Sequence, residues 1–554
     1  MKRTLAAGIP AALLLALLVS PGPAPGTAAE SADDRPLDAR TYAQGIDALR
    51  QGKRDEGIRV LRKLTQDFPD SPFAPQALLK TAELIYPVSS WDQIGSASPA
   101  AIKEASELLQ SLAQKYRSSH EAPRALVKLG YVSLEPANPK ADLEEACGRF
   151  ATAAQVYPDS DAADDAYFGS GMCETLRARP AMAADFFSRL MDESPTSPLA
   201  AEALYRFGVA LSHLDDPAEA MIALERVRTR YADSRFAPKA LERITLLHRL
   251  RLQPALMREA GKVGGSVTAK RIGGDAPGPP PDPEIYRLDA SYGAPPTVRA
   301  ATTAGGKPEE SFRGAGDIAI DAQGLVVLAS PRTPGVFRLD TRGKVQERIA
   351  HPSPEYVAVG DGLAVFISGG GQISLNAKNW SGTDLKSWDG RPPREFGAVA
   401  VDPSGRVYVL DPRDNVLLIY DRSRRLVGNL RPQGKDARFV DVARSEDGGV
   451  YVLEPRMKKV VELTQGKVTR EINLSTLGAN EPVSLAADGL GDLYLLEGRS
   501  GFVYVASPAG ERIAVIRPPK DALERIGEPS AVAVDAVGRV YVSGRKSTTI
   551  VRFQ

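Results

Sequence analysis

A turn glycine returns about every 40 residues in the C-terminal half of the chain. Each of these glycines lies between two short apolar segments, as in AVAVDPSGRVYVLD at residues 398–411. The spacings between successive glycines are 38, 43, 43, 43 and 47 residues. The repeated glycines are Gly324, Gly362, Gly405, Gly448, Gly491 and Gly538. One small sheet of short antiparallel strands cannot bury both of its faces, so the repeated sheets must pack against one another.

The best unit, residues 398–430, predicts four strands joined by three turns because β-rich alternation is interrupted by polar turn residues. Four strands at a period near forty are typical of a β-propeller. Six units are visible, so the sequence predicts a six-bladed propeller over residues 297–554. The last blade lacks an outer strand before Gln554, and the segment 297–304 is expected to pair with 549–553 and close the ring.

These units resemble the NHL-repeat family, through AVDPSGRVYVLD at 400–411, AVDAVGRVYV at 533–542 and AIDAQG at 319–324. The resemblance covers roughly residues 297–554. Members of that family mostly bind proteins or nucleic acid, so the resemblance implies a binding platform without naming the ligand. One departure is that the family's Asn-Arg pair before the third strand is replaced by Asn415-Val416 in the best unit.

The preceding half of the chain predicts helices, since apolar residues follow three- and four-residue steps between about 41 and 250. A second repeat joins these helices, with members such as YPDSDAADDAY from Tyr157 and YADSRFAPKAL from Tyr231. Its serine, which is expected to cap the following helix, recurs at spacings of 48, 41, 37 and 37 residues. The repeat resembles tetratricopeptide repeats, especially those of bacterial envelope proteins, and implies an α-solenoid with a concave face.

The N-terminus has the order of a secretory signal peptide: Lys2 and Arg3, an apolar core at 5–19, and small residues before a cleavage site after Ala29. The alternative is a membrane anchor, although Gly8 and Pro10 interrupt the apolar run. The predicted organisation is a signal peptide (1–29), a disordered segment (30–40), tetratricopeptide-like helical repeats (41–260), a Gly/Pro-rich linker (261–296) and the propeller (297–554). The mature chain is expected in the bacterial periplasm or outside the cell, without a membrane span.

The composition favours binding over catalysis. Lys and Arg number 70 against 69 Asp and Glu, which argues against nucleic acid as the partner. The four histidines are too few and too scattered for a propeller metal site, and no catalytic constellation or cofactor is expected. The recurrent aspartates Asp321, Asp402, Asp488 and Asp535 are interpreted as turn residues. The predicted function is a non-enzymatic scaffold for protein or envelope-polymer partners; the alternative is a propeller hydrolase or lyase acting on sugars or lactones with a central metal.

The two cysteines of the chain, Cys147 and Cys173, lie equidistant from the turn at residue 160. Residues equidistant from the turn of a helical hairpin lie at the same height, and an exported protein meets an oxidising compartment. These two facts predict a disulfide. Two buried thiols remain the alternative.

An arginine follows the second strand in five of the six predicted blades. These arginines are Arg332, Arg413, Arg456, Arg499 and Arg545. Loops between second and third strands emerge on one face of a propeller, so we expect a ring of arginines there, interrupted at Gly370. Guanidinium groups suit carboxylates or phosphates, which predicts an acidic protein segment or an anionic polymer as ligand. Local ion pairs with Asp411, Glu454 and Glu497 are the alternative.

Overall fold

The computed structural model describes residues 35–253, 286–289 and 312–554, apart from short gaps at 96, 136, 215, 361–364, 370–371, 376–377, 380–384, 422–423, 446 and 465. The predicted signal peptide, residues 1–29, lies outside the described residues. No helix of the described part is long and apolar enough to cross a membrane.

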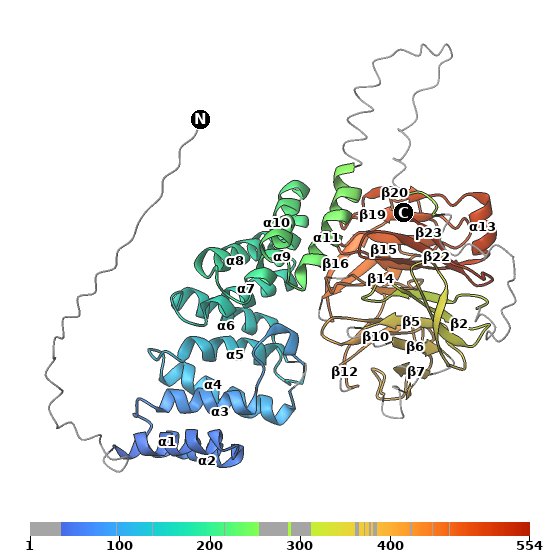
Figure 1. The fold of residues 1–554 in the computed structure, drawn as a ribbon. Helices are drawn as coiled ribbons and strands as arrows, with labels where there is room; N and C mark the ends of the chain where they lie inside the picture. Colours follow the sequence, from blue (N-terminus) through green and yellow to red (C-terminus); the bar gives the residue numbers. More distant parts are fainter. Residues whose placement is uncertain are drawn as a thin grey trace, which may run out of the picture. The chain divides into compact units, whose positions relative to one another are not determined.

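The N-terminal region is helical and its helices pair in sequence order (Figure 1). They are α1 (Leu37–Arg50), α2 (Arg54–Asp67), α3 (Ala74–Ile85), η1 (Trp91–Gln93), α4 (Pro99–Lys115), α5 (Ala122–Leu134), α6 (Leu143–Val156), α7 (Ala163–Leu176), α8 (Pro180–Glu193), α9 (Ala200–Ser212), α10 (Pro217–Arg230), α11 (Phe236–Leu247) and η2 (His248–Leu252). The helix α1 begins inside the segment 30–40, which was expected to be disordered.

The repeated serines make the turns between helices, as the sequence predicts. The N–H of Ser160 donates to the carbonyl of Tyr157 and its carbonyl accepts from Ala163 N–H, which lets α7 begin directly after the turn. At two of the turns the serine hydroxyl does both tasks: Ser71 and Ser197 accept the N–H groups of Phe73 and Leu199, directly before the next helix, and donate to Asp38 and Asp164. These hydroxyls therefore bond the residue that leads into the helix rather than an N–H group of its first turn, and they add a bond across the repeat.

Glycines allow the helices of the repeats to approach closely. A Cβ at Gly169 would lie 2.3 Å from the ring of Phe150, and a Cβ at Gly130 would lie 2.6 Å from the same ring. The ring of Phe150 is completely buried and also meets Tyr131 edge to face. The core of α5, α6 and α7 therefore depends on the absence of two side chains.

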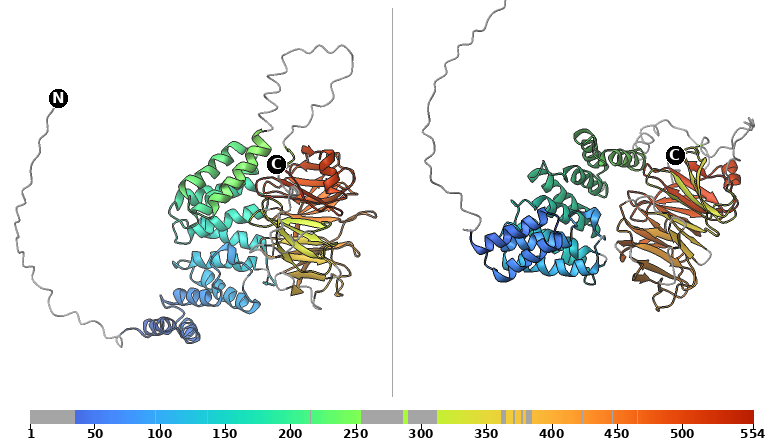
Figure 2. Two further views of the ribbon diagram at one scale, coloured as in Figure 1. Left: turned by 45° about the vertical axis from the view of Figure 1, so that its right-hand side comes forward. Right: turned by 60° about the horizontal axis from the view of Figure 1, so that its bottom comes forward.

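The C-terminal region is a β-propeller (Figures 1 and 2). The first blade consists of β1 (Asp317–Ile320), β2 (Val326–Ser330), β3 (Gly335–Leu339) and β4 (Val345–Ile349), and the second of β5 (Tyr356–Val359), β6 (Val365–Gly369), β7 (Gln372–Leu375) and β8 (Lys378–Asn379). The third blade consists of β9 (Val399–Val401), β10 (Val407–Asp411), β11 (Val416–Tyr420) and β12 (Leu426–Leu430), and the fourth of β13 (Asp441–Arg444), β14 (Val450–Glu454), β15 (Lys459–Thr464) and β16 (Lys467–Asn473). The fifth blade consists of β17 (Pro482–Ala487), β18 (Leu493–Glu497), β19 (Val503–Ala506) and β20 (Arg512–Ile516), and the last sheet of β21 (Pro529–Val534), β22 (Val540–Gly544) and β23 (Val551–Phe553). A short helix, α13 (Lys520–Ile526), precedes β21.

The described strands form five complete four-stranded blades, and the sheet β21–β22–β23 has three strands. The predicted count of six blades is therefore wrong. The difference arises in the last sheet, in which β23 is the last of three described strands. The first strands β1, β5, β9, β13, β17 and β21 neighbour one another in a ring.

The outer edge of β23 is covered by residues 286–289. Arg287 exchanges both backbone hydrogen bonds with Gln554, at 2.8 Å each, and Asp289 N–H donates to the carbonyl of Arg552. The carboxylate of Asp289 also pairs with the Arg552 guanidinium, and both side chains are buried. The segment that the sequence analysis expects to cover this edge, residues 297–304, lies outside the described part of the chain. This end of the predicted linker instead belongs to the last sheet.

The recurrent aspartates are turn residues, as predicted. Asp402, for example, accepts the N–H of Arg406 at 2.9 Å and the hydroxyl of Tyr408 at 2.9 Å. Asp488 and Asp535 make the same bond to a tyrosine six residues later, Tyr494 and Tyr541. Each aspartate thus fastens the turn between the first two strands to its own blade.

The loops between first and second strands also carry the contacts of the last helices with the propeller. Arg243 on α11 is buried, bonds the carbonyl of Gly489 and reaches Asp447 at 2.6 Å. Arg251 makes two bonds to Asp492, at 2.7 and 2.9 Å. Since β-strands alternate in direction, these loops lie at the opposite end of the sheets from the loops between second and third strands.

Candidate functional site: the arginine face of the propeller

The five predicted arginines all lie in loops between second and third strands and are all exposed. We call the surface formed by these loops and by the segments that lead into each first strand the arginine face. It is the end of the propeller that the contacts of α11 and η2 leave uncovered. The structure therefore offers these side chains to solvent, but their electrostatic surroundings differ from blade to blade.

In two blades, a glutamate in the segment before the first strand accompanies the arginine. The Nε atom of Arg413 lies 3.4 Å from Glu395, and the Nε atom of Arg499 lies 4.0 Å from Glu481. The Arg499 side chain is 91% exposed, so this pair is a solvated contact. Exposed pairs of this kind contribute about 0.2–1 kcal/mol and leave most of the guanidinium available to a ligand.

Arg332 and Arg545 come together around Gly314. A Cβ at Gly314 would lie 2.4 Å from the carbonyl oxygen of Arg545 and 3.1 Å from Cδ of Arg332, so the close approach requires glycine. Glu528 faces the same group of cations. Its hydrogen bond to Lys546, aided by the charges of Arg332 and Arg545, lowers the pKa of the Glu528 carboxyl below its ordinary value.

The acids that precede the arginines by two residues do not pair with them. Asp411 accepts three backbone N–H groups, from Arg394, Arg413 and Asp414. Glu497 accepts from Asn480 and Ser500, and the nearest cation to Glu454 is Lys459, at 3.4 Å. These carboxylates organise their own loops, and the ion pairs of the loop arginines within the described residues involve Glu395 and Glu481 instead.

Arg456 differs from the other four arginines. Among the described residues, no ion pair or hydrogen bond involves its guanidinium group, and the side chain is exposed. The fourth blade is thus the place where the charge of the arginine face has no acidic neighbour within reach. The predicted interruption at Gly370 lies outside the described residues.

The sequence analysis missed two acids on first strands, Asp317 and Asp441, which we call the channel acids because first strands line the central channel of a propeller. Asp317, Tyr356, Asp441 and Ser484 occupy the same position at the start of four first strands. Asp317 and Asp441 each accept an N–H from the next blade, at 3.0 and 2.8 Å, from Val357 and Leu485. Burial, and for Asp317 also the charge of Asp441, raises the pKa of each carboxyl well above its ordinary value. These positions could have been found by aligning the first strands of the blades, in which Ala398 is the equivalent residue of the third blade.

These channel acids do not by themselves form a metal site. The described residues contain no group of three or more His, Cys, Asp and Glu side chains placed to hold a metal ion. Each of the two carboxylates instead accepts a backbone N–H of the next blade, so these side chains link neighbouring blades. Tyr356 stands beside them, and burial together with the charges of Asp441 and Asp317 raises the pKa of its hydroxyl to about 12.

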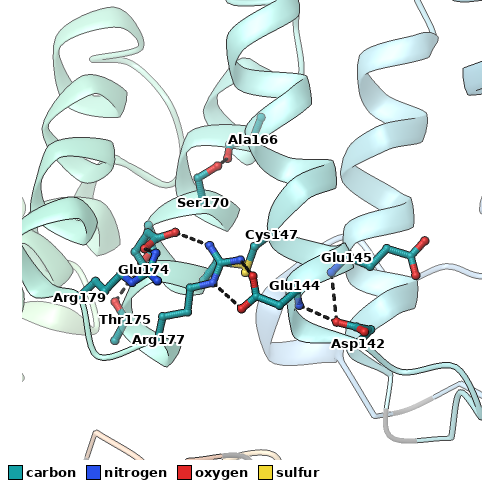
Figure 3. The surroundings of a disulfide bond; sticks show 12 residues. Asp142, Glu144, Glu145, Cys147, Ala166, Ser170, Glu174, Thr175, Arg177 and Arg179 are labelled. Carbon is teal, nitrogen blue, oxygen red and sulfur yellow. Dashed lines mark hydrogen bonds and ion pairs between the residues drawn. A yellow bond between two sulfur atoms is a disulfide. The ribbon is translucent and has the colours of Figure 1, made fainter. Parts of the chain in front are cut away.

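The cysteines lie in the helical region, away from the propeller. In the structure, Cys147 on α6 and Cys173 on α7 form a disulfide with their Cα atoms 5.5 Å apart (Figure 3). Beside it, Arg177 bonds Glu144 on α6 and lies 2.6 Å from Glu174 on α7. The disulfide and the arginine therefore join the same two helices; for the protein in solution the disulfide stays a prediction.

Comparison with known proteins bears on both halves of the chain. The tetratricopeptide repeat family matches residues 39–71 and 202–234, which contain the hairpins α1–α2 and α9–α10. No curated protein matches the chain. The chain therefore combines a helical region that contains tetratricopeptide repeats with a C-terminal β-propeller.

Solved structures match this chain at low sequence identity. A virginiamycin B lyase from Staphylococcus aureus is 14% identical, with a TM-score of 0.33, over 44% of this chain and 83% of that chain. A gluconolactonase from Xanthomonas campestris is also 14% identical, with a TM-score of 0.34, over 44% of this chain and 87% of that chain. A protein of unknown function from Bacteroides caccae is 13% identical, with a TM-score of 0.31, over 41% of this chain and 87% of that chain. At these TM-scores, the matches do not bear on the activity or substrate of this chain.

Proposed function

We propose that this chain is an exported, non-enzymatic scaffold that binds protein partners through its helical repeats and through the arginine face of its propeller. The observation that carries the proposal is the match to tetratricopeptide repeats in two separate hairpins of the helical region. Stacked helical hairpins present extended surfaces to other proteins. Export is supported by the order of charged, apolar and small residues at 1–29.

One charged position recurs on the first helices of three hairpins, at Arg124, Asp165 and Glu202. Burial and the charges of Asp165, Asp164 and Glu202 raise the pKa of the Tyr131 hydroxyl on α5. Burial and the neighbouring Asp164 raise the pKa of Asp165 to about 6. This mixed row is the part of the helical surface that we expect to select a partner by charge.

The test is capture of partners from envelope extract by the immobilised full-length protein, followed by binding of the purified partner. Asp165→Arg is expected to reduce capture through the helices. Neutralising Arg413, Arg456 and Arg499 together is expected to weaken capture through the propeller and its dependence on salt, with thermal stability close to wild type. Loss of stability with unchanged binding per folded molecule would assign the arginines a structural role instead.

The alternative, a hydrolase or lyase with a central metal, draws on the channel acids Asp317 and Asp441. It predicts a stoichiometric metal in the purified protein and its loss in the variant Asp441→Asn. Metal analysis and turnover of sugar lactones by the full chain decide between the two functions. A stoichiometric metal together with turnover would contradict the scaffold.

A further inference from the structure

Two loop positions can be compared directly among the third, fourth and fifth blades, because equivalent residues of successive blades are 43 residues apart. The first position holds Glu395, Arg438 and Glu481, in the segment before the first strand. The backbone confirms the equivalence: Gly397 N–H bonds the carbonyl of Leu410, and Val440 N–H bonds that of Leu453. In the fourth blade, therefore, an arginine stands where its neighbours have the glutamate that faces the loop arginine.

The second position holds Asn415, Lys458 and Gly501, in the loop before the third strand. All three adopt left-handed backbone conformations, with φ of 50°, 49° and 71°. Glycine and asparagine tolerate this conformation, whereas a lysine there costs about 1 kcal/mol. The fourth blade thus keeps a strained cation where its neighbours have residues suited to the turn, and strained residues gather at functional sites.

These two exchanges concentrate positive charge on the fourth blade. Arg438, Arg456 and Lys458 are exposed, and within the described part of the chain none of them has a carboxylate partner. We call these three residues the basic sector. The guanidinium of Arg438 donates to the carbonyl of Pro412, 3.3 Å away, which directs it toward the loop of the third blade. Lys435 and Asp436, exposed in the same segment, cancel in formal charge and leave the sector's charge unchanged.

One exposed apolar side chain lies in the same loop as two residues of the basic sector, and a second lies on the strand β17, which neighbours β13 and β14. Met457 lies between Arg456 and Lys458 and is 48% exposed, with its Cε atom near Gly434. Val483, at the start of β17 in the next blade, is 37% exposed. An anionic polymer needs only the cations, whereas an acidic protein segment with an apolar side chain uses both features. The surface therefore favours a protein ligand.

We infer that the basic sector of the fourth blade binds an acidic protein segment that carries an apolar side chain, with its carboxylates on Arg438, Arg456 and Lys458 and its apolar group on Met457 and Val483. This inference rests on the proposed scaffold function and names the partner class of one of its surfaces. The arginines of the third and fifth blades, which have glutamate neighbours, add charge at the rim.

The experiment measures binding of a short fluorescein-labelled peptide, Asp and Glu residues around a central leucine, to the full chain by fluorescence anisotropy. Arg438→Glu gives the fourth blade the pattern of its neighbours, so Arg456 gains an acid and the fold is kept. It is expected to raise the dissociation constant at least about tenfold. Lys458→Gly relieves the left-handed lysine and is expected to weaken binding while keeping stability. The matched control is Arg342→Glu, in the β3–β4 loop at the other end of the sheets, with unchanged binding.

A gain-of-function variant guards against a trivial loss of binding. Glu481→Arg gives the fifth blade the equivalents of Arg438 and Arg456, although not of Lys458, and is expected to strengthen binding of the peptide. Peptide binding that Arg438→Glu leaves unchanged, or that Arg342→Glu weakens equally, would overturn the inference. Equal binding of heparin and of a peptide with glycine in place of leucine would also overturn it, in favour of an anionic polymer. If Arg438→Glu abolishes peptide binding but leaves a partner captured through the helices, the sector and the scaffold are both supported; if it changes neither, the sector fails and the scaffold stands.

Discussion

The helical repeats and the propeller are held together in different ways. In the helices, contacts join neighbours in the sequence, such as Phe150 of α6 against the glycines of α5 and α7. In the propeller, the last sheet is completed by residues 286–289, and the buried pair Asp289–Arg552 joins positions 263 residues apart. Damage to a repeat should therefore remain local, whereas damage to the closing segment should be felt by the whole ring.

The largest effect is expected at the closing segment. Asp289→Ala leaves the Arg552 guanidinium buried without its carboxylate, and breaking a buried pair in this way costs about 3–5 kcal/mol. Chemical denaturation followed by circular dichroism in the β region measures the loss. Arg287→Ala is the control, since that side chain is exposed and its bonds to Gln554 are made by the backbone. Equal stability of the two variants would contradict closure by this segment.

Next comes the disulfide of the helical region. The double variant Cys147→Ser and Cys173→Ser is expected to lose about 3 kcal/mol relative to the oxidised protein, because a cross-link limits the unfolded chain. The loss should appear in the unfolding of the helices and leave the propeller transition in place. Thiol titration of the denatured, unreduced protein is the direct check: two reactive thiols per chain would show that the disulfide is absent.

Close packing of the repeats predicts a smaller, local effect. Gly169→Ala places a methyl group against the Phe150 ring and should cost about 1–3 kcal/mol. Gly148→Ala is a matched control on α6, since nothing lies within 4 Å of the added Cβ, and it should be neutral or stabilising by up to about 1 kcal/mol. Urea denaturation of both variants separates packing from helix propensity. A Gly169→Ala protein as stable as the control would show that the helices can move apart freely.

The channel acids predict how stability depends on pH. Burial and the charge of Asp441 raise the pKa of Asp317 in the folded protein. The folded state therefore holds a proton that the unfolded state releases, and stability falls as pH rises above the ordinary carboxyl range. From pH 6 to 7 the fall is at most about 1.4 kcal/mol. Asp317→Asn should flatten the dependence of stability on pH. A slope equal to that of the wild type would show that another group titrates. The titratable groups that face Asp317 are Asp441 and the Tyr356 hydroxyl.

The smallest stability effect is expected in the fourth blade. Arg438→Glu introduces an exposed ion pair with Arg456 and should stabilise by less than about 1 kcal/mol, as exposed pairs do. Thermal unfolding at low and high salt measures it, since salt screens such a pair. A large loss of stability would mean that the Arg438 bond to Pro412 supports the propeller. The segment that contains Arg438 would then be a structural element of the propeller.

Much of the architecture could be predicted from residues close together in the chain. The turn serines, such as Ser160, and the turn aspartates, such as Asp402, act within a few residues of their own position, so their roles are visible as spacing. The loop arginines could also be placed, because one face follows from the order of strands. The acids that accompany them were missed, because Glu395 and Arg413 belong to different loops of the blade.

The sequence by itself indicated the two kinds of repeat and the end of the propeller on which the arginines lie, and it predicted the pairing of Cys147 with Cys173 across one turn. Each follows from a local period or from the geometry of a single hairpin. The tertiary structure alone decided that residues 286–289 cover the edge of β23, that Asp317 and Asp441 each bond the neighbouring blade, and that no acid of the described residues pairs with Arg456. Those features depend on contacts between residues brought together by closure of the ring, and no periodicity along the chain records which distant segments meet.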